Sequence, residues 1–137
     1  MQTNDEPLQQ EGYDLMAAAF EVHNDLGHGF SEEIYQEALE TELAARGIPF
    51  LAQSEIAVFY KGHPLRKKFR PDLIVGGRII VELKAVSALT TEHESQLLNY
   101  LKATGQPVGY LVNFGCGPKL EWKRFARTRA EVDRSRI

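Results

Sequence analysis

Apolar residues recur every three or four positions in three stretches of the chain, which predicts three amphipathic helices. The first covers residues 13–26 and the second residues 31–47, each followed or closed by glycine. The third covers residues 91–105 and begins with Thr91 and Glu94, whose spacing is that of a capping box. Each stretch has one apolar face, which is typical of a helix that packs on a larger element of the fold.

The remaining apolar segments predict five strands. They are expected at residues 49–60, 65–75, 79–84, 108–114 and 120–125. The run at 108–114 is almost continuously apolar, as in a strand that is buried on both faces. The resulting order α-α-β-β-β-α-β-β indicates an α/β protein with a mixed central sheet flanked by helices.

Length and composition fit one folded domain, because the chain has 137 residues, 43% of them hydrophobic and 26% charged. We expect a flexible N-terminal tail at 1–10, a single domain at 11–127 and a basic C-terminal tail at 128–137. The lone Cys116 and the lack of Cys/His pairs with metal spacing argue against a zinc site. Without a signal peptide or a long apolar run, a cytoplasmic protein that does not contact membranes is expected.

Charge is distributed unevenly along the chain. Residues 1–60 contain 12 Asp/Glu and one Lys/Arg, whereas residues 61–137 contain 7 Asp/Glu and 15 Lys/Arg. A basic half of this kind favours a polyanionic partner such as nucleic acid. Two runs are candidate contacts to phosphates, the alternative being solvated strand edges that resist aggregation. They comprise Arg66, Lys67, Lys68 and Arg70, and then Lys119, Lys123 and Arg124.

Charged residues interrupt the apolar strand at 79–84 and the strand before it. Glu82 and Lys84 are two residues apart and so share a face, and Asp72 lies in the neighbouring strand. Buried carboxylates need compensation, and two of them with bound water suit Mg²⁺ or Mn²⁺. Lys84 could then orient or activate a water and stabilise charge in phosphodiester hydrolysis. The alternative interpretation is an ordinary surface pair of Glu and Lys.

A shared site imposes a condition on the hairpin between these strands. A two-residue turn at Gly76–Gly77 would place Asp72 and Glu82 on opposite faces of the sheet. The metal-site hypothesis therefore predicts a three-residue loop ending in a glycine with positive φ, or an equivalent bulge.

The same residues resemble the motif of the PD-(D/E)XK nuclease superfamily, whose core is a helix, a three-strand meander, a helix and a strand. Pro71-Asp72 and Glu82-Leu83-Lys84 match that motif, and Gln96 and Tyr100 resemble the QxxxY motif of its RecB-like branch. Gly29, Glu32 and Tyr35 resemble the signature of the GxxExxY family within it. The likeness covers about residues 12–127. It extends through Phe30, Ala38-Leu39, Gly47-Ile48-Pro49-Phe50, Tyr60-Lys61-Gly62, Leu89, Leu98-Asn99-Tyr100-Leu101 and Asn113-Phe114-Gly115.

By this resemblance Asp72 and Glu82 are metal ligands and Glu32 is a third acidic member of the site. Gln96 is expected to contact the attacking water, Lys84 or a phosphate, and Tyr100 to hydrogen-bond within the site. The structural alternatives are a favourable charge at a helix start for Glu32, and helix capping with core packing for Gln96 and Tyr100.

The sequence therefore predicts a restriction-endonuclease-like fold and a nuclease that depends on Mg²⁺ or Mn²⁺. DNA is favoured over RNA as the substrate, and a homodimer is compatible with the sequence. One alternative is an inactive module that binds nucleic acid or protein. Another is an enzyme for a different phosphorylated substrate, because a fold does not fix a function. Outside the motifs, His93 lies one turn before Gln96; it is expected to face solvent, the alternative being that it reaches the same cleft.

Overall fold

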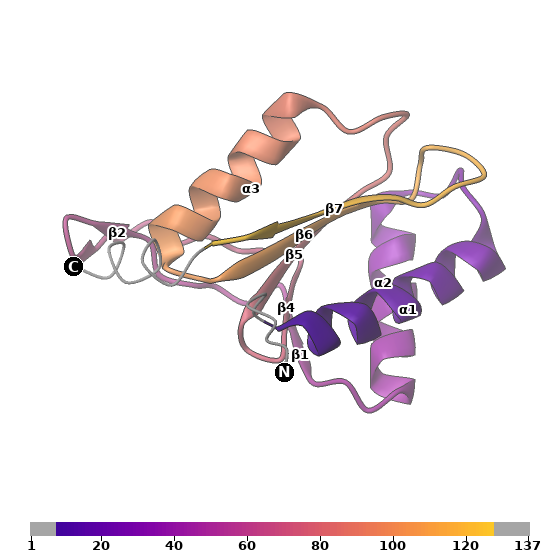
Figure 1. The fold of residues 1–137 in the computed structure, drawn as a ribbon, viewed down its shortest axis with the longest axis horizontal. Helices are drawn as coiled ribbons and strands as arrows, with labels where there is room; N and C mark the ends of the chain where they lie inside the picture. Colours follow the sequence, from indigo (N-terminus) through magenta and orange to yellow (C-terminus); the bar gives the residue numbers. More distant parts are fainter. Residues whose placement is uncertain (1–7, 128–137) are drawn as a thin grey trace, which may run out of the picture.

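The protein is built around a five-stranded mixed sheet in the computed structural model, which describes residues 8–127 (Figure 1). The strand order is β1-β4-β5-β6-β7, in which β5 and β6 are parallel and the other neighbours are antiparallel. The strands are β1 (Phe50–Ala52), β4 (Leu73–Val75), β5 (Ile79–Lys84), β6 (Val108–Asn113) and β7 (Glu121–Ala126). This confirms the predicted α/β class with a mixed sheet flanked by helices.

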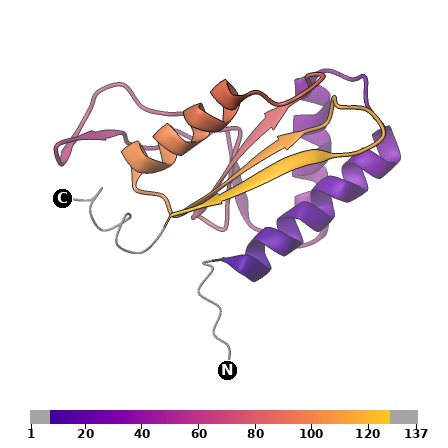
Figure 2. The same cartoon turned by 45° about the horizontal axis from the view of Figure 1, so that its top comes forward.

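Helices cover both faces of the sheet, as Figure 2 shows. On one face lie α1 (Gln9–Leu26) and α2 (Glu32–Ala45), and on the other lies α3 (Thr91–Thr104), which connects the parallel strands β5 and β6. No helix in the part of the chain that the structure describes is long and apolar enough to cross a membrane.

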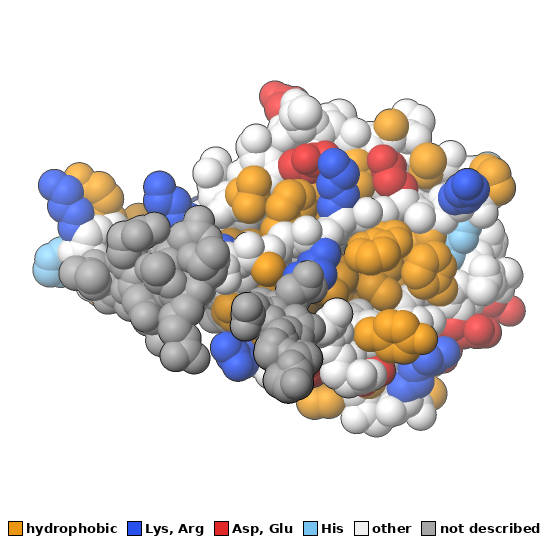
Figure 3. Space-filling model, viewed as in Figure 1, with side chains coloured by type: hydrophobic (Ala, Val, Ile, Leu, Met, Phe, Trp, Pro, Cys, Tyr) orange, Lys and Arg blue, Asp and Glu red, His pale blue; other side chains and the backbone are white. Residues whose placement is uncertain are grey.

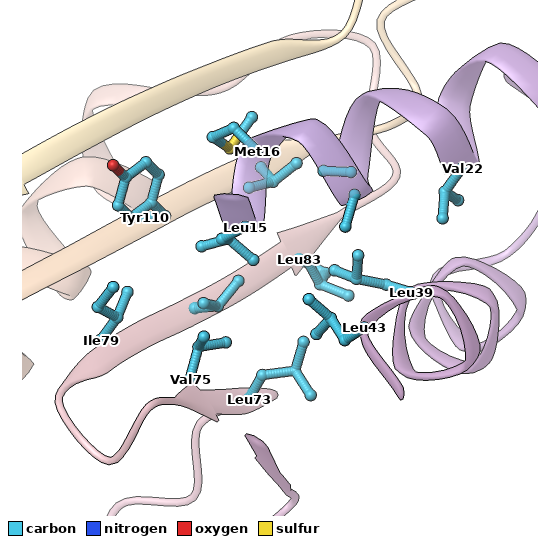
Figure 4. Close-up of a cluster of buried hydrophobic side chains, with 14 of the residues drawn as sticks. Leu15, Met16, Val22, Leu39, Leu43, Leu73, Val75, Ile79, Leu83 and Tyr110 are labelled. Carbon is cyan, nitrogen blue, oxygen red and sulfur yellow. The ribbon is translucent and has the colours of Figure 1, made fainter. Parts of the chain in front are cut away.

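Alternate residues of β5 separate two apolar clusters. Ile79, Val81 and Leu83 pack with α1 and α2 in the larger cluster, part of which is drawn in Figure 4. Ile80 packs under α3 in the smaller cluster. Gly12 lets α1 approach the sheet closely, because a Cβ there would overlap the Tyr110 hydroxyl. The even-numbered side of β5 therefore faces α3, and this is the side that carries Glu82 and Lys84.

The three predicted helices are present, and the first of them starts earlier than expected. The first begins at Gln9, inside the segment expected to be a tail; residues 1–7 and the predicted basic tail at 128–137 lie outside the described residues. Ser31 occupies the N-cap of α2, although its side chain makes no capping hydrogen bond. The capping box of α3 is formed by Thr90 and His93, so the prediction of Thr91 and Glu94 was wrong.

The single strand predicted at residues 65–75 is divided. Only its last part, β4, joins the main sheet, whereas residues 65–69 continue from a separate two-stranded hairpin of β2 (Phe59–Tyr60) and β3 (His63–Pro64). A bridge between Ile56 and Phe69 closes the base of this hairpin. We call residues 56–69 the arm. In Figures 1 and 2 its β2–β3 end projects beyond the C-terminal end of α3.

The connection between β4 and β5 contains three residues, as the metal-site hypothesis requires. Val75 pairs with Ile79, so Gly76, Gly77 and Arg78 form the loop. Both glycines have positive φ, at 62° and 76°, and the Arg78 N–H donates to the Val75 carbonyl at 3.3 Å. This is the φ pattern of a type I′ turn with one added residue, so the expected odd number is confirmed. The final loop residue is arginine, so the prediction of a loop ending in glycine was wrong.

Candidate active site

The β4–β5 hairpin places the two predicted metal-binding carboxylates on one face. Leu73 pairs with Val81, and continuing this register by one step places Asp72 opposite Glu82. Residues opposite each other on antiparallel strands share a face. Lys84 is two positions further along β5 and lies on the same side, toward α3.

A cavity of about 310 Å³ opens on this face between β5, α3 and the base of the arm. Polar side chains from three elements converge on it, while apolar side chains form its inner wall. Its lining comprises Lys68, Phe69, Arg70, Glu82, Lys84, His93, Gln96, Leu97, Tyr100 and Leu111. The cavity thus contains four of the six predicted catalytic residues, and Asp72 adjoins Glu82 at its side.

Glu82 has an environment unfavourable to an isolated negative charge. Burial, followed by the neighbouring charge of Asp72, raises the pKa of Glu82 from 4.5 to about 8. The positive charge of Lys84 acts in the opposite direction on the same pKa but does not cancel these effects. Among the described residues, Glu82 Oε2 is the buried side-chain oxygen that has no hydrogen-bond partner. A buried carboxylate without a hydrogen-bond partner is stabilised when it binds a proton or a cation.

Asp72 is fixed in position by backbone and side-chain contacts. Its Oδ2 accepts a hydrogen bond from the Leu83 N–H at 2.7 Å. Its carbonyl oxygen accepts from the Gln36 side-chain amide at 2.9 Å and from the Gln53 N–H at 3.2 Å. These contacts tie Asp72 to β5, α2 and the end of β1, so its carboxylate is held beside Glu82 before any ligand binds.

This donor set fits a divalent cation of the Mg²⁺ type. Such ions bind through one or two carboxylates and retain several waters, and Asp72 with the unpartnered Glu82 Oε2 offers two carboxylates. In residues 8–127 no three His, Cys, Asp or Glu side chains are grouped closely enough to hold a metal by themselves. Water and substrate oxygens would therefore complete the coordination.

Glu32 does not line the cavity. It is exposed in the first turn of α2, one turn before Gln36, whose side chain reaches Asp72. The helix face that carries Glu32 is thus directed toward Asp72, but Glu32 does not form a cluster with the two carboxylates in the described residues. Its role in the site stays a prediction.

The face of α3 over the cavity presents His93, Gln96 and Tyr100. Gln96 is exposed, and the Tyr100 ring stacks on Phe69 with 3.7 Å between ring centroids and 7° between ring planes. Tyr100 therefore makes the predicted packing contact while it still lines the cavity. His93 was expected to face solvent, but it is half-buried in the cavity wall, and its Nδ1 accepts from the Thr90 N–H.

The seven predicted phosphate-binding residues do not form one surface. Lys68 and Arg70 line the cavity, and Arg66, Lys67 and Lys119 are exposed. The remaining two lie on β7, where adjacent side chains point to opposite faces. Lys123 pairs with Glu94 on the α3 side at 3.0 Å, whereas Arg124 donates to the Tyr110 hydroxyl on the other side.

Sequence reasoning missed two residues that shape the site. Gln36 was not considered, although it lies one helical turn from Glu32 and that spacing could have suggested a shared face. Phe69 was read as part of a strand, and no local pattern indicates that its ring packs on Tyr100.

Comparison with known proteins agrees with this geometry. A sequence model of the PD-(D/E)XK nuclease superfamily matches residues 9–125, whereas no curated protein matches. The solved protein SSO0001 is similar in structure, with a TM-score of 0.54 and 20% sequence identity. The match covers 93% of this chain and 64% of SSO0001, so the chain spans less than two thirds of that protein. The family match extends from α1 to β7 and includes both carboxylates, Lys84 and α3, and the chain belongs to the PD-(D/E)XK nuclease superfamily.

Proposed function

We propose that the protein hydrolyses phosphodiester bonds of nucleic acid with the help of a divalent cation, Mg²⁺ or Mn²⁺, held by Asp72 and Glu82. The observation that carries this proposal is the buried Glu82 carboxylate, which lies beside Asp72 with one oxygen unpartnered. A cation bound there would polarise the scissile phosphate and lower the pKa of a coordinated water.

Asp72 and Glu82 contribute by holding their oxygens in place before substrate arrives. The hydrogen bond from Leu83 to Asp72 and the burial of Glu82 fix the pair within the hairpin. Little reorganisation is then needed when ligand enters, and preorganisation of charged groups is a large contribution to catalysis.

Lys84 supplies a positive charge at the cavity wall, two residues from Glu82. Its ammonium group can hold the attacking water and stabilise the negative charge that grows on the phosphate. Gln96 faces the same cavity from α3 and can hydrogen-bond to that water, to Lys84 or to a phosphate oxygen.

DNA is the substrate we propose, with Lys68 and Arg70 as phosphate contacts beside the cavity. The resemblance to the GxxExxY signature and to the QxxxY motif supports roles for Glu32, Gln96 and Tyr100 in the same reaction. A cytoplasmic location is part of the same proposal.

Asp72→Asn should abolish metal-dependent cleavage while leaving the fold intact. An asparagine side chain keeps an oxygen to accept from the Leu83 N–H, but it removes one of the two ligand charges. The measurement is cleavage of labelled single-stranded, branched and duplex DNA in Mg²⁺ or Mn²⁺, with EDTA as the metal-free reference. Circular dichroism and thermal unfolding check the fold.

The matched control for this variant is Asp25→Asn, which makes the same change at an exposed position of α1. Wild-type cleavage is expected from the control. Cleavage by Asp72→Asn at the wild-type rate would contradict the proposed site, and a wild-type protein inert on every substrate would contradict the proposed activity.

Lys84→Met should lower the single-turnover rate about 100-fold or more at saturating metal, which is the loss typical of removing one group that stabilises the transition state. Metal affinity should not weaken, because removing a positive charge relieves repulsion of a cation. Calorimetric titration with Mn²⁺ measures the affinity, and Lys102→Met on the exposed end of α3 is the control. Lost metal binding with an unchanged rate would rule out this role for Lys84.

Glu82 should make the metal-free protein less stable as pH rises. Its folded-state pKa of about 8 lies above the unfolded value, so the folded state binds the Glu82 proton more tightly than the unfolded state does. The stabilisation that this proton provides is lost as pH rises toward 8. Glu82→Gln removes the effect. The unfolding free energy of Glu82→Gln minus that of wild type should therefore increase by more than about 1 kcal/mol from pH 5.5 to pH 8.5.

Urea unfolding in EDTA at the two pH values measures this difference. Glu37→Gln, at an exposed position of α2, should show no pH-dependent gain. A constant difference between wild type and Glu82→Gln across the pH range would show that Glu82 is not held in a charge-disfavouring environment.

A further inference from the structure

The tip of the arm exposes two aromatic side chains away from the core. Phe59 is 40% exposed and Tyr60 is 60% exposed. Tyr60 pairs with His63 across the hairpin, so these two rings share one face, and the Lys61 ammonium lies 5.5 Å from the centre of the Tyr60 ring. Figure 3 shows basic, hydrophobic and histidine side chains gathered at the projecting end of the molecule, on the left of the view. This combination is suited to stacking on a nucleobase.

A bulge lies between the tip and the base of the arm. The Leu65 N–H donates to Val58, and the next pairing joins Ile56 to Phe69. One residue therefore lies between these pairings on the outgoing strand and three lie on the returning strand. The three are Arg66, Lys67 and Lys68, and all are exposed. Because bulges redirect side chains out of a regular ladder, the extra length of this strand displays its cations to solvent.

The arm has an electrostatic character that matches a phosphate chain. Residues 56–69 contain four Lys/Arg and no Asp/Glu, and the adjacent Arg70 adds a fifth cation. The acidic residue that pairs with this segment is Glu55, whose carboxylate lies 3.7 Å from the Arg70 guanidinium with both side chains more than half exposed. An exposed pair of this kind contributes little and is readily exchanged for another anion.

The base of the arm is also the wall of the candidate active site. Lys68, Phe69 and Arg70 line the same cavity as Glu82 and Lys84, and Phe69 is anchored there by its stacking on Tyr100. From Phe69 to the tip at Gly62 the strand can span at most about 23 Å at about 3.3 Å per residue. That length corresponds to about seven stacked nucleotides.

We infer that the arm binds an unpaired strand of the nucleic-acid substrate, with one base stacked on Tyr60 and the phosphates of that strand along Arg66–Lys68. An aromatic ring can stack on a base only where the face of that base is free, so the substrate class is nucleic acid with unpaired bases several nucleotides from the scissile phosphate. This inference rests on the proposed function, because it assigns the substrate of the same cavity.

The test measures the binding of a fluorescein-labelled single strand and of its blunt duplex by fluorescence anisotropy. The full chain carries Asp72→Asn so that the oligonucleotides stay intact in Mg²⁺. Tyr60→Ala should weaken single-strand binding about 5- to 100-fold and change duplex binding less than twofold. Tyr60→Phe should restore binding, since it keeps the ring.

The matched control is Tyr13→Ala, which removes a tyrosine that is 71% exposed on α1 and far from the arm in sequence. It should leave both affinities unchanged. A second measurement replaces one base of the single strand at a time with an abasic site. At the stacked position an abasic site should lower the affinity strongly for the protein that retains Tyr60. It should not lower the affinity for Tyr60→Ala, and this difference assigns the effect to the Tyr60 ring.

Equal affinities of Tyr60→Ala and Tyr13→Ala for the single strand would overturn the inference. So would an effect of Tyr60→Ala confined to self-association in light scattering. In both cases cleavage of DNA by the wild-type protein in Mg²⁺ would leave the proposed function standing. Absence of both cleavage and nucleic-acid binding in the wild-type protein would overturn the proposed function, and this inference with it.

Discussion

The pairing of β4 with β5 decides which side chains can act together at the candidate active site. Three residues connect these strands, so Asp72 lies opposite Glu82 and both face α3. One residue fewer in the loop would reverse the face of Glu82 and Lys84 relative to Asp72. The two glycines of the loop adopt the positive φ angles that this turn needs. Every chemical property proposed for the site therefore depends on the backbone geometry of this one hairpin.

The rest of the fold gives that hairpin its electrostatic effect. α1 and α2 bury the odd-numbered residues of β5, while α3 and the base of the arm enclose the even-numbered side. Because Glu82 is buried beside Asp72, solvent does not stabilise the charge of its carboxylate. Among the described residues, no protein group hydrogen-bonds to Glu82 Oε2. The same enclosing elements contribute Lys68, Arg70 and Gln96, so the surfaces that create the charge imbalance also offer groups to bind a phosphate.

Sequence patterns predicted the features that depend on local periodicity. The apolar stripe of α2 follows from helical spacing, and the buried β6 follows from its continuous apolar character. The odd-numbered hairpin loop follows from strand parity once Asp72 and Glu82 are required to share a site. A turn near residues 61–64 between two extended segments was predicted, but the separation of the arm from the main sheet was not, because its bulge interrupts the alternation. The stacking of Phe69 on Tyr100 joins residues that are distant in sequence, so no local pattern indicates it. The capping box forms between Thr90 and His93, whereas the predicted pair of Thr91 and Glu94 has the same spacing, so local sequence does not choose between the two pairs. The position of Glu32 depends on how α2 packs, which its own sequence does not determine.

The central claim is that Asp72 and Glu82 together hold the divalent cation. Crystals soaked in Mn²⁺ and measured for anomalous scattering test it most directly. The account predicts one anomalous peak bonded to a carboxylate oxygen of Asp72 and to Oε2 of Glu82, with the remaining ligands being water. A peak at other residues, or a Mn²⁺-soaked crystal in which neither carboxylate binds the ion, would contradict it.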